Sequence, residues 1–231
     1  MSLHQPLPSL EGWEDLNLKG LKIGVYWQWF RHADAETVAA CEAMLKEYEK
    51  MGCELIEIVI PNLEANRVAH SIIILSEMAQ GMDATYAAHH QEHALDVRIN
   101  LALARQFSAT DYLTAQRIRT RIINHFNAAF QKADVILTPA TGVSAPAIKK
   151  GALPDGESDL STTIEIMRFV TAGNLTGFPA ISFPVGYTQN NLPIGLQVIG
   201  KAWDEKTLLR MALAAEQVIE RKAPQVHYKI L

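Results

Sequence analysis

The chain has 231 residues, of which 48% are hydrophobic and 20% charged, and its formal net charge is −4. This composition favours a folded soluble protein over a disordered one, and the mildly acidic charge gives no reason to expect nucleic acid as a partner. We expect residues 1–231 to form a single domain, because single α/β domains of this size are common.

The two cysteines, Cys41 and Cys53, are too few for a disulfide framework and match no paired zinc-ligand spacing. We therefore expect both to be reduced core residues. The longest apolar stretch, at 71–75, is far too short to span a bilayer, and residues 1–8 lack a basic region followed by an apolar run. These features predict a cytoplasmic protein without a membrane span.

The first part of the chain predicts a strand, a helix and a second strand. Residues 21–26 form a short apolar run rich in β-branched side chains. Asp34 is a suitable N-cap for a helix that continues to Gly52, and residues 53–60 have the composition of another strand. A strand–helix–strand unit of this size implies parallel pairing with a right-handed crossover.

The middle of the chain is predicted to be mostly helical. Residues 62–132 have helical spacing of apolar side chains, with interruptions near Gly81 and around 106–110. A third strand is predicted over 134–139, followed by a long loop that continues to Asp159. Loops of that length inside a domain are usually functional or mobile.

The last part of the chain predicts a short helix and then a β-hairpin. The helix is expected over 162–172 and is ended by Gly173 and Gly177. Pro179 begins the next strand, and residues 192–200 form the return strand of the hairpin. A final amphipathic helix follows, so the complete pattern predicts a sheet that contains both parallel and antiparallel pairs.

Three stretches of the sequence resemble amidase-signature enzymes. The stretch AGNLTGFPAISFPVGYTQNNLPIGLQVIG, at 172–200, resembles the C-terminal signature region of that family. NLKGLKIGVY at 17–26 and ADVILTPATGV at 133–143 add matches in the same order. These stretches are more similar in sequence to the plant-type fatty acid amide hydrolases than to the tRNA-amidotransferase branch. The resemblance spans about residues 13–222.

The resemblance implies a three-layer α/β/α fold around a mixed sheet. It also implies hydrolysis of a carboxamide by an acyl-enzyme route, with long-chain fatty acid amides or N-acylethanolamines as substrates and without a cofactor. In such enzymes the nucleophile is a serine, activated through a second serine and a lysine. Backbone amides of a Gly- and Ser-rich loop stabilise the oxyanion, where negative charge develops.

The sequence lacks the motifs in which this family carries its catalytic residues. It contains no Ser-Ser pair, no Gly-Gly pair and no Gly-x-Ser-x-Gly elbow, so we assign no catalytic residue. We interpret the chain as the C-terminal part of an amidase that is inactive alone. The alternative is a stand-alone, non-catalytic α/β protein that kept the fold for binding or assembly.

An incomplete sheet has consequences for the partners of the chain. Removing part of a mixed sheet is expected to leave a strand edge or an apolar face uncovered, and such surfaces tend to be buried by association. The predicted partners are therefore an N-terminal amidase portion, or further copies of the chain in a dimer or larger assembly. A small-molecule amide is the expected substrate if the site is completed.

Six residues are candidates for substrate binding, because they match segments that approach the acyl-binding channel of such enzymes. They are Thr138, Thr141, Gly142, Met167, Thr171 and Asn174. For Thr138 and Asn174 we favour the alternative that they satisfy backbone groups at the ends of elements, as turn residues often do. A methionine such as Met167 is more often a core residue than part of a substrate channel.

One short motif suggests a metal site instead. His89, Glu92 and His93 stand in the H-x-x-E-H order of one class of zinc peptidase. No further ligand can be identified, and the HHQEH run is equally typical of a solvated helix end. We favour the solvated helix end and predict no metal site.

Overall fold

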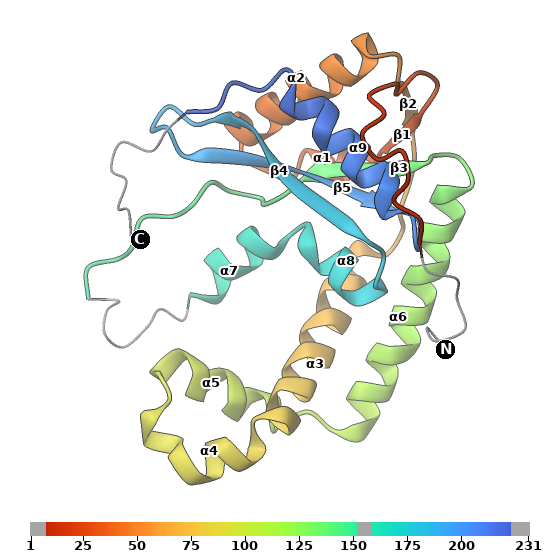
Figure 1. Ribbon diagram of the computed structural model, residues 1–231. Coiled ribbons are helices and arrows are strands. Elements are labelled where there is room, and N and C mark those ends of the chain that lie inside the picture. Colours follow the sequence, from red (N-terminus) through yellow and green to blue (C-terminus); the bar gives the residue numbers. More distant parts are fainter. Residues whose placement is uncertain (1–7, 152–158, 223–231) are drawn as a thin grey trace.

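Five strands form one mixed sheet in the order β2-β1-β3-β5-β4 (Figure 1). The strands are β1 (Lys22–Val25), β2 (Glu54–Glu57), β3 (Val135–Pro139), β4 (Ala180–Tyr187) and β5 (Pro193–Gly200). β1 is parallel to both β2 and β3, whereas β5 is antiparallel to both β3 and β4. The structure is a computed structural model that describes residues 8–151 and 159–222.

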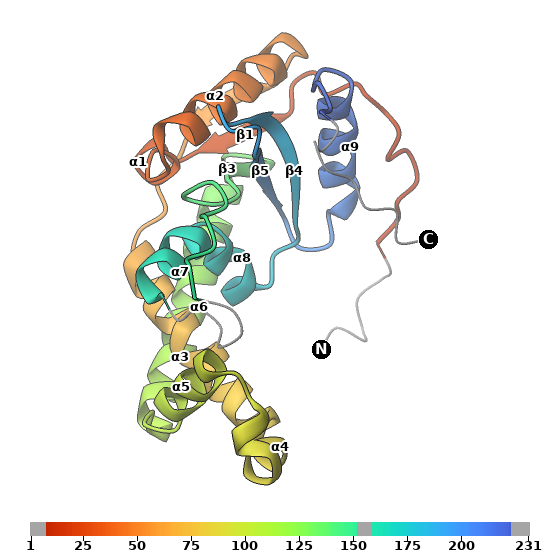
Figure 2. The same ribbon diagram turned by 90° about the vertical axis from the view of Figure 1, so that its left-hand side faces the viewer.

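Helices connect these strands and cover the sheet. Within the described residues they are α1 (Trp27–Phe30), α2 (Ala35–Lys50), α3 (Leu63–Gly81), α4 (Asp83–His89), the 3-10 turn η2 (His90–Glu92), α5 (Leu95–Ala104), α6 (Ala109–Phe130), α7 (Leu160–Met167), α8 (Val170–Thr176) and α9 (Glu205–Glu216). Figure 2 shows α9 on one side of the sheet and α6 and α8 on the other. This arrangement confirms the predicted α/β fold with a mixed sheet between helical layers.

The alternation of side chains along each strand determines which helices cover which face. Leu196 and Val198 of β5 are fully buried in one apolar cluster with residues of α2 and α9. Ile199 of the same strand and Ile136 of β3 lie in a second cluster with residues of α6 and α8. Because successive side chains of a strand point to opposite faces, the sheet has a separate core on each side.

The predicted start of α2 is confirmed in detail. The Asp34 side chain accepts a hydrogen bond from the main-chain N–H of Thr37 at 2.8 Å, as an N-cap does. At the other end of α2, the buried Tyr48 hydroxyl donates to the main-chain oxygen of Met211 in α9 at 2.9 Å. This bond joins the two helices that cover the same face of the sheet.

A helical arm extends away from the sheet. It is formed by α3, α4, α5 and the first part of α6, and both views show α4 and α5 far from the strands (Figures 1 and 2). A small apolar cluster holds α3 against α6 and contains Ala69, Ile73 and Ala115. α6 begins with a capping box between Ser108 and Asp111, which confirms a predicted boundary near 106–110.

Two predicted boundaries were wrong. The second strand was expected over 53–60, but β2 is shorter because it pairs only with the four residues of β1. The helix expected over 162–172 is two helices, α7 and α8, which meet at Arg168 and Phe169. Gly173 does not end a helix, since α8 passes through it and stops only at Gly177.

Part of the predicted long loop, 152–158, lies outside the described residues.

The two cysteines agree with the expectation from the sequence. Cys41 and Cys53 are both free and buried, as predicted. Burial, with a smaller contribution from the Asp34 carboxylate, raises the pKa of the Cys41 thiol to about 12, so this thiol stays protonated at neutral pH. Among the described residues, no helix is long and apolar enough to span a bilayer.

Candidate functional site

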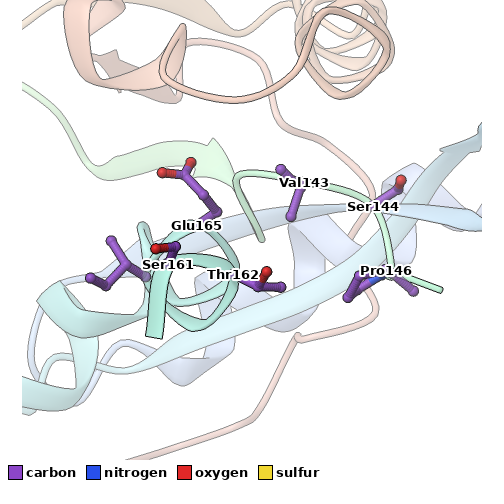
Figure 3. A pocket seen from close by; sticks show the side chains of 8 residues that line it. Val143, Ser144, Pro146, Ser161, Thr162 and Glu165 are labelled. Atoms are coloured by element: carbon purple, nitrogen blue, oxygen red, sulfur yellow. The ribbon is translucent and has the colours of Figure 1, made fainter. Parts of the chain in front are cut away.

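A hollow of about 590 Å³ lies beyond the end of β3, between the loop that follows this strand and α7 (Figure 3). Its lining includes three hydroxyl side chains, one carboxylate and several apolar side chains. Among the lining residues are Val143, Ser144, Pro146, Ser161, Thr162 and Glu165. The hollow lies next to the predicted substrate-binding residues Thr141 and Gly142, which makes it the candidate site.

The loop that forms one wall of the hollow is held at Gly142. The N–H of Gly142 donates to the main-chain oxygen of Glu165 in α7 at 3.0 Å, and its C=O accepts from the N–H of Asp34 at 2.9 Å. A Cβ atom at this position would lie 2.5 Å from the Glu165 main-chain oxygen. The close approach of the loop to α7 therefore requires glycine.

Asp34 contributes a second contact to the same loop. One carboxylate oxygen caps α2, and the other accepts a hydrogen bond from the N–H of Ser144 at 3.2 Å. The side chain of Thr141 also stays within the loop, since its hydroxyl donates to the main-chain oxygen of Val143 at 2.8 Å. The start of α2, the loop and α7 consequently form one hydrogen-bonded unit.

The other wall of the hollow begins at Asp159, the N-cap of α7. Its carboxylate accepts from the Thr162 N–H at 3.1 Å, from the Thr162 hydroxyl at 3.0 Å and from Lys149 Nζ at 2.7 Å. The hydrogen bond from Lys149, followed by those from Thr162, holds the pKa of Asp159 well below its usual range. Asp159 therefore stays ionised and ties the loop residue Lys149 to α7.

The carboxylate that lines the hollow is part of an ion pair. Glu165 is paired with Arg168, and the hydrogen bond from that guanidinium lowers the pKa of the Glu165 carboxyl. An ionised, paired carboxylate is a weak general base at neutral pH. Within the described residues, no hydrogen bond joins the Ser144 or Ser161 hydroxyl to a histidine or lysine, the arrangement that activates a serine.

The six predicted binding residues do not lie together. Thr141 and Gly142 border the hollow, and Met167 is half-buried at the end of α7. Thr138 is 1% exposed, and its hydroxyl oxygen accepts from the Gln197 side chain at 3.1 Å. Gln197 also donates to the main-chain oxygen of Phe169 at 3.3 Å. Thr138 thus belongs to a buried network between the sheet and α8.

Thr171 and Asn174 lie on α8 but have different surroundings. Thr171 is 4% exposed and accepts a hydrogen bond from the Asn66 amide at 3.1 Å, which links α8 to α3. Asn174 lines a second hollow, of about 380 Å³, between α3, α6 and α8. A role in substrate binding stays a prediction for all six residues, and the geometry places only Thr141 and Gly142 beside the first hollow.

Sequence reasoning missed Asp34, Asp159 and Glu165 as residues that shape the site. The spacing Asp159-x-x-Thr162 is a recognisable N-cap signal, so the start of α7 could have been found. The contacts of Asp34 with Gly142 and Ser144 have no comparable signal, because they join residues more than 100 positions apart in the chain.

The H-x-x-E-H motif does not form a site in the structure. α4 ends at His89, and His93 has extended backbone angles, so the two histidines do not share one helix. Glu92 contacts His89 itself at 2.8 Å. Within 8–151 and 159–222, no group of three histidine, cysteine, aspartate or glutamate side chains could hold a metal ion.

The second hollow contains a histidine that should make stability depend on pH. His70 is 6% exposed, and burial lowers the pKa of its imidazole from 6.5. The unfolded chain therefore binds the proton more readily, so His70 contributes stability that is complete above pH 6.5 and is lost as the pH falls through the folded-state pKa.

We expect the free energy of unfolding to decrease as the pH is lowered from neutral through this range, and His70→Gln to make the decrease shallower. Urea denaturation at a series of pH values measures both slopes. Equal slopes for the variant and the unchanged protein would contradict this assignment.

The Amidase family model matches residues 5–209 of the chain. The chain belongs to the amidase-signature family. The fatty acid amide hydrolase of Medicago truncatula is 43% identical over 231 residues, covering 97% of this chain and 38% of that protein. The amidase of Pseudomonas putida is 32% identical over 221 residues, covering 94% of this chain and 47% of that protein.

A solved structure shares the fold of this family member. A glutamyl-tRNA(Gln) amidotransferase subunit from Thermotoga maritima matches with a TM-score of 0.70 at 24% identity, over 93% of this chain and 46% of that one. The chain therefore spans less than half the length of each of these three proteins. The predicted family is confirmed, the similarity to a plant fatty acid amide hydrolase agrees with the predicted resemblance, and the structural match supports the predicted fold.

Proposed function

We propose that the chain is the C-terminal part of an amidase-signature hydrolase that acts on carboxamides, with long-chain fatty acid amides or N-acylethanolamines as the substrate class. The similarity to the fatty acid amide hydrolase of Medicago truncatula over 97% of this chain supports the substrate class. The main structural support is the hydrogen-bonded unit around Gly142, which shapes a hollow with apolar side chains beside β3.

In this proposal the chain holds the substrate, and a companion portion supplies the nucleophile. Acyl transfer from an amide needs an activated hydroxyl and donors for the oxyanion. Among the described residues, no histidine or lysine is hydrogen-bonded to the Ser144 or Ser161 hydroxyl, whereas Val143, Pro146 and Ile164 offer apolar surface for an acyl chain. The companion is an N-terminal amidase portion, and the buried, reduced Cys41 and Cys53 agree with a cytoplasmic location.

The first test is whether the isolated chain is inactive. The purified chain is mixed with a fluorophosphonate probe that reacts with activated serines, and separately with a long-chain N-acylethanolamine. We expect no labelling of the chain and no release of ethanolamine. Specific labelling, or hydrolysis without a companion, would show that the nucleophile lies on this chain. Either result would refute the proposal that a companion portion supplies it.

Binding in the hollow is the second test. Ile164 is 38% exposed and lines the hollow, so Ile164→Asn should weaken binding of a fluorescent long-chain N-acylethanolamine about tenfold, the effect of ~1.4 kcal/mol of lost apolar contact. The matched control is Leu113→Asn, because Leu113 is 62% exposed on α6 and does not line the hollow. Equal affinities of the two variants for the fluorescent amide would place its binding elsewhere.

A further inference from the structure

Two helix N-termini contact the walls of the hollow beside β3, and an aspartate already occupies each of them. Helix N-termini commonly bind anions, because their first N–H groups are unpaired and the helix dipole favours negative charge. Asp34 caps α2 and also accepts from the N–H of Ser144 in the lining, while Asp159 caps α7 and also binds Lys149. These N-termini therefore offer no free site to a carboxylate ligand.

A third carboxylate belongs to the lining itself. Glu165 lines the hollow, whereas its ion-pair partner Arg168, at the end of α7, is not one of the lining residues. The hydrogen bond from Arg168 lowers the pKa of the Glu165 carboxyl, so this group is ionised at neutral pH. The Glu165 side chain keeps 41% of its surface exposed, so its negative charge is not enclosed by the pair.

The remaining lining residues of the described chain are uncharged. Four of them are apolar and three carry a hydroxyl group (Figure 3): Val143, Ala145, Pro146, Ile164, Ser144, Ser161 and Thr162. The lining formed by the described residues thus contains one negative charge and no lysine, arginine or histidine. A negatively charged ligand would find repulsion from Glu165 there without a compensating cation.

The hydroxyl side chains suit an uncharged amide head group. A hydroxyl both donates and accepts, and a carboxamide presents one C=O acceptor and one N–H donor, so the two can pair without a net charge. The ionised head group of a fatty acid differs from the amide mainly in its negative charge. Because like charges repel at close range, Glu165 should distinguish the two head groups, while the apolar side chains treat their acyl chains alike.

We propose that Glu165 makes the hollow selective for the uncharged long-chain amide over the fatty acid that hydrolysis of this amide releases. The inference rests on the proposed function, because it requires the substrate to occupy the hollow. The amide enters without electrostatic repulsion, whereas the acid is ionised at neutral pH and is repelled by the Glu165 carboxylate. Accumulated product would then compete only weakly with the substrate for the hollow.

Two fluorescent ligands with the same long acyl chain test this selectivity, one an N-acylethanolamine and the other the free fatty acid. Both are titrated into the full chain at pH 8, where the acid is ionised. In Glu165→Gln the ratio of acid affinity to amide affinity should rise about threefold, as expected for a screened interaction between two accessible charges. The substitution keeps the length of the side chain and the main-chain oxygen that binds the Gly142 N–H.

Glu47→Gln is the matched control. Glu47 pairs with Lys50 three residues further along α2, as Glu165 does with Arg168, and its side chain is 37% exposed compared with 41% for Glu165. Glu47 does not line the hollow. This variant removes the same charge from the chain and should leave the affinity ratio unchanged. An equal rise of the ratio in both variants would overturn the proposal, because net charge alone would then explain it.

Salt provides a measurement that uses no variant. Raising the ionic strength from about 0.1 M to 1 M shortens the Debye length from about 10 Å to 3 Å, so the ratio of acid affinity to amide affinity should rise in the unchanged chain. A ratio that responds neither to salt nor to Glu165→Gln, although the amide binds, would overturn this inference alone. Equal amide affinities of Ile164→Asn and Leu113→Asn would instead refute binding in the hollow, and the selectivity with it.

Discussion

Replacing Phe126 with alanine should lower the free energy of unfolding by about 3–5 kcal/mol, the usual cost of removing a fully buried aromatic side chain. Phe126 is 0% exposed on α6, and its ring centroid lies 6.4 Å from that of Trp29 and 5.9 Å from that of Phe178. These rings come from three separate parts of the chain. The substitution would therefore leave a cavity where α6 packs beneath the sheet.

Urea denaturation followed by circular dichroism measures this loss, and a substitution on the same helix provides the control. Leu113 is 62% exposed, so Leu113→Ala should change stability by less than about 0.5 kcal/mol. Losses of similar size for the two variants would show that helix propensity, and not the buried aromatic cluster, determines the contribution of α6.

The elements with strong local signals were predictable from the sequence. The helix α2 has an N-cap at Asp34 and a regular apolar stripe, and both ends of the helix were found. The strand–helix–strand unit likewise gave the parallel pairing of β1 with β2. In each case residues close together in the chain carry the necessary information, through capping or through the spacing of apolar side chains.

Elements whose limits depend on distant partners were not predictable. The break between α7 and α8 places Phe169 in a fully buried position against Trp29, with ring centroids 5.5 Å apart. Nothing in the local spacing of this segment requires that contact. The extent of β2 similarly depends on the length of β1, because a strand ends where its partner ends.

The same limit applies to the candidate site. Thr138 and Gln197 are 59 positions apart in the chain, and Asn66 and Thr171 are 105 positions apart. Resemblance to a family indicates which segments approach a substrate channel, but not which side chains of those segments point into the protein core. Both threonine hydroxyls accept hydrogen bonds from buried amide side chains and so connect elements of the fold. Substrate binding stays a prediction for both.

Gly142 and Gly173 should respond in opposite directions to an added side chain. Gly142→Val should lower the free energy of unfolding by about 1–3 kcal/mol, the usual cost of overpacking. Its Cβ would lie 2.5 Å from the Glu165 main-chain oxygen, so the loop must move away from α7. Gly173 lies inside α8, and a Cβ atom there would meet no neighbouring atom within 4 Å, so Gly173→Ala should stabilise the helix by up to about 1 kcal/mol.

Hydrogen exchange separates a local effect at Gly142 from a general loss of stability. The N–H groups of Gly142 and Ser144 are bonded to Glu165 and Asp34, so both should lose protection in Gly142→Val while the N–H of Thr37 in α2 keeps it. Unchanged protection at Ser144 would mean that the loop tolerates the side chain in place. In that case the contact between Gly142 and α7 does not determine the shape of the hollow, and the binding wall proposed for this amidase-signature chain would need a different support.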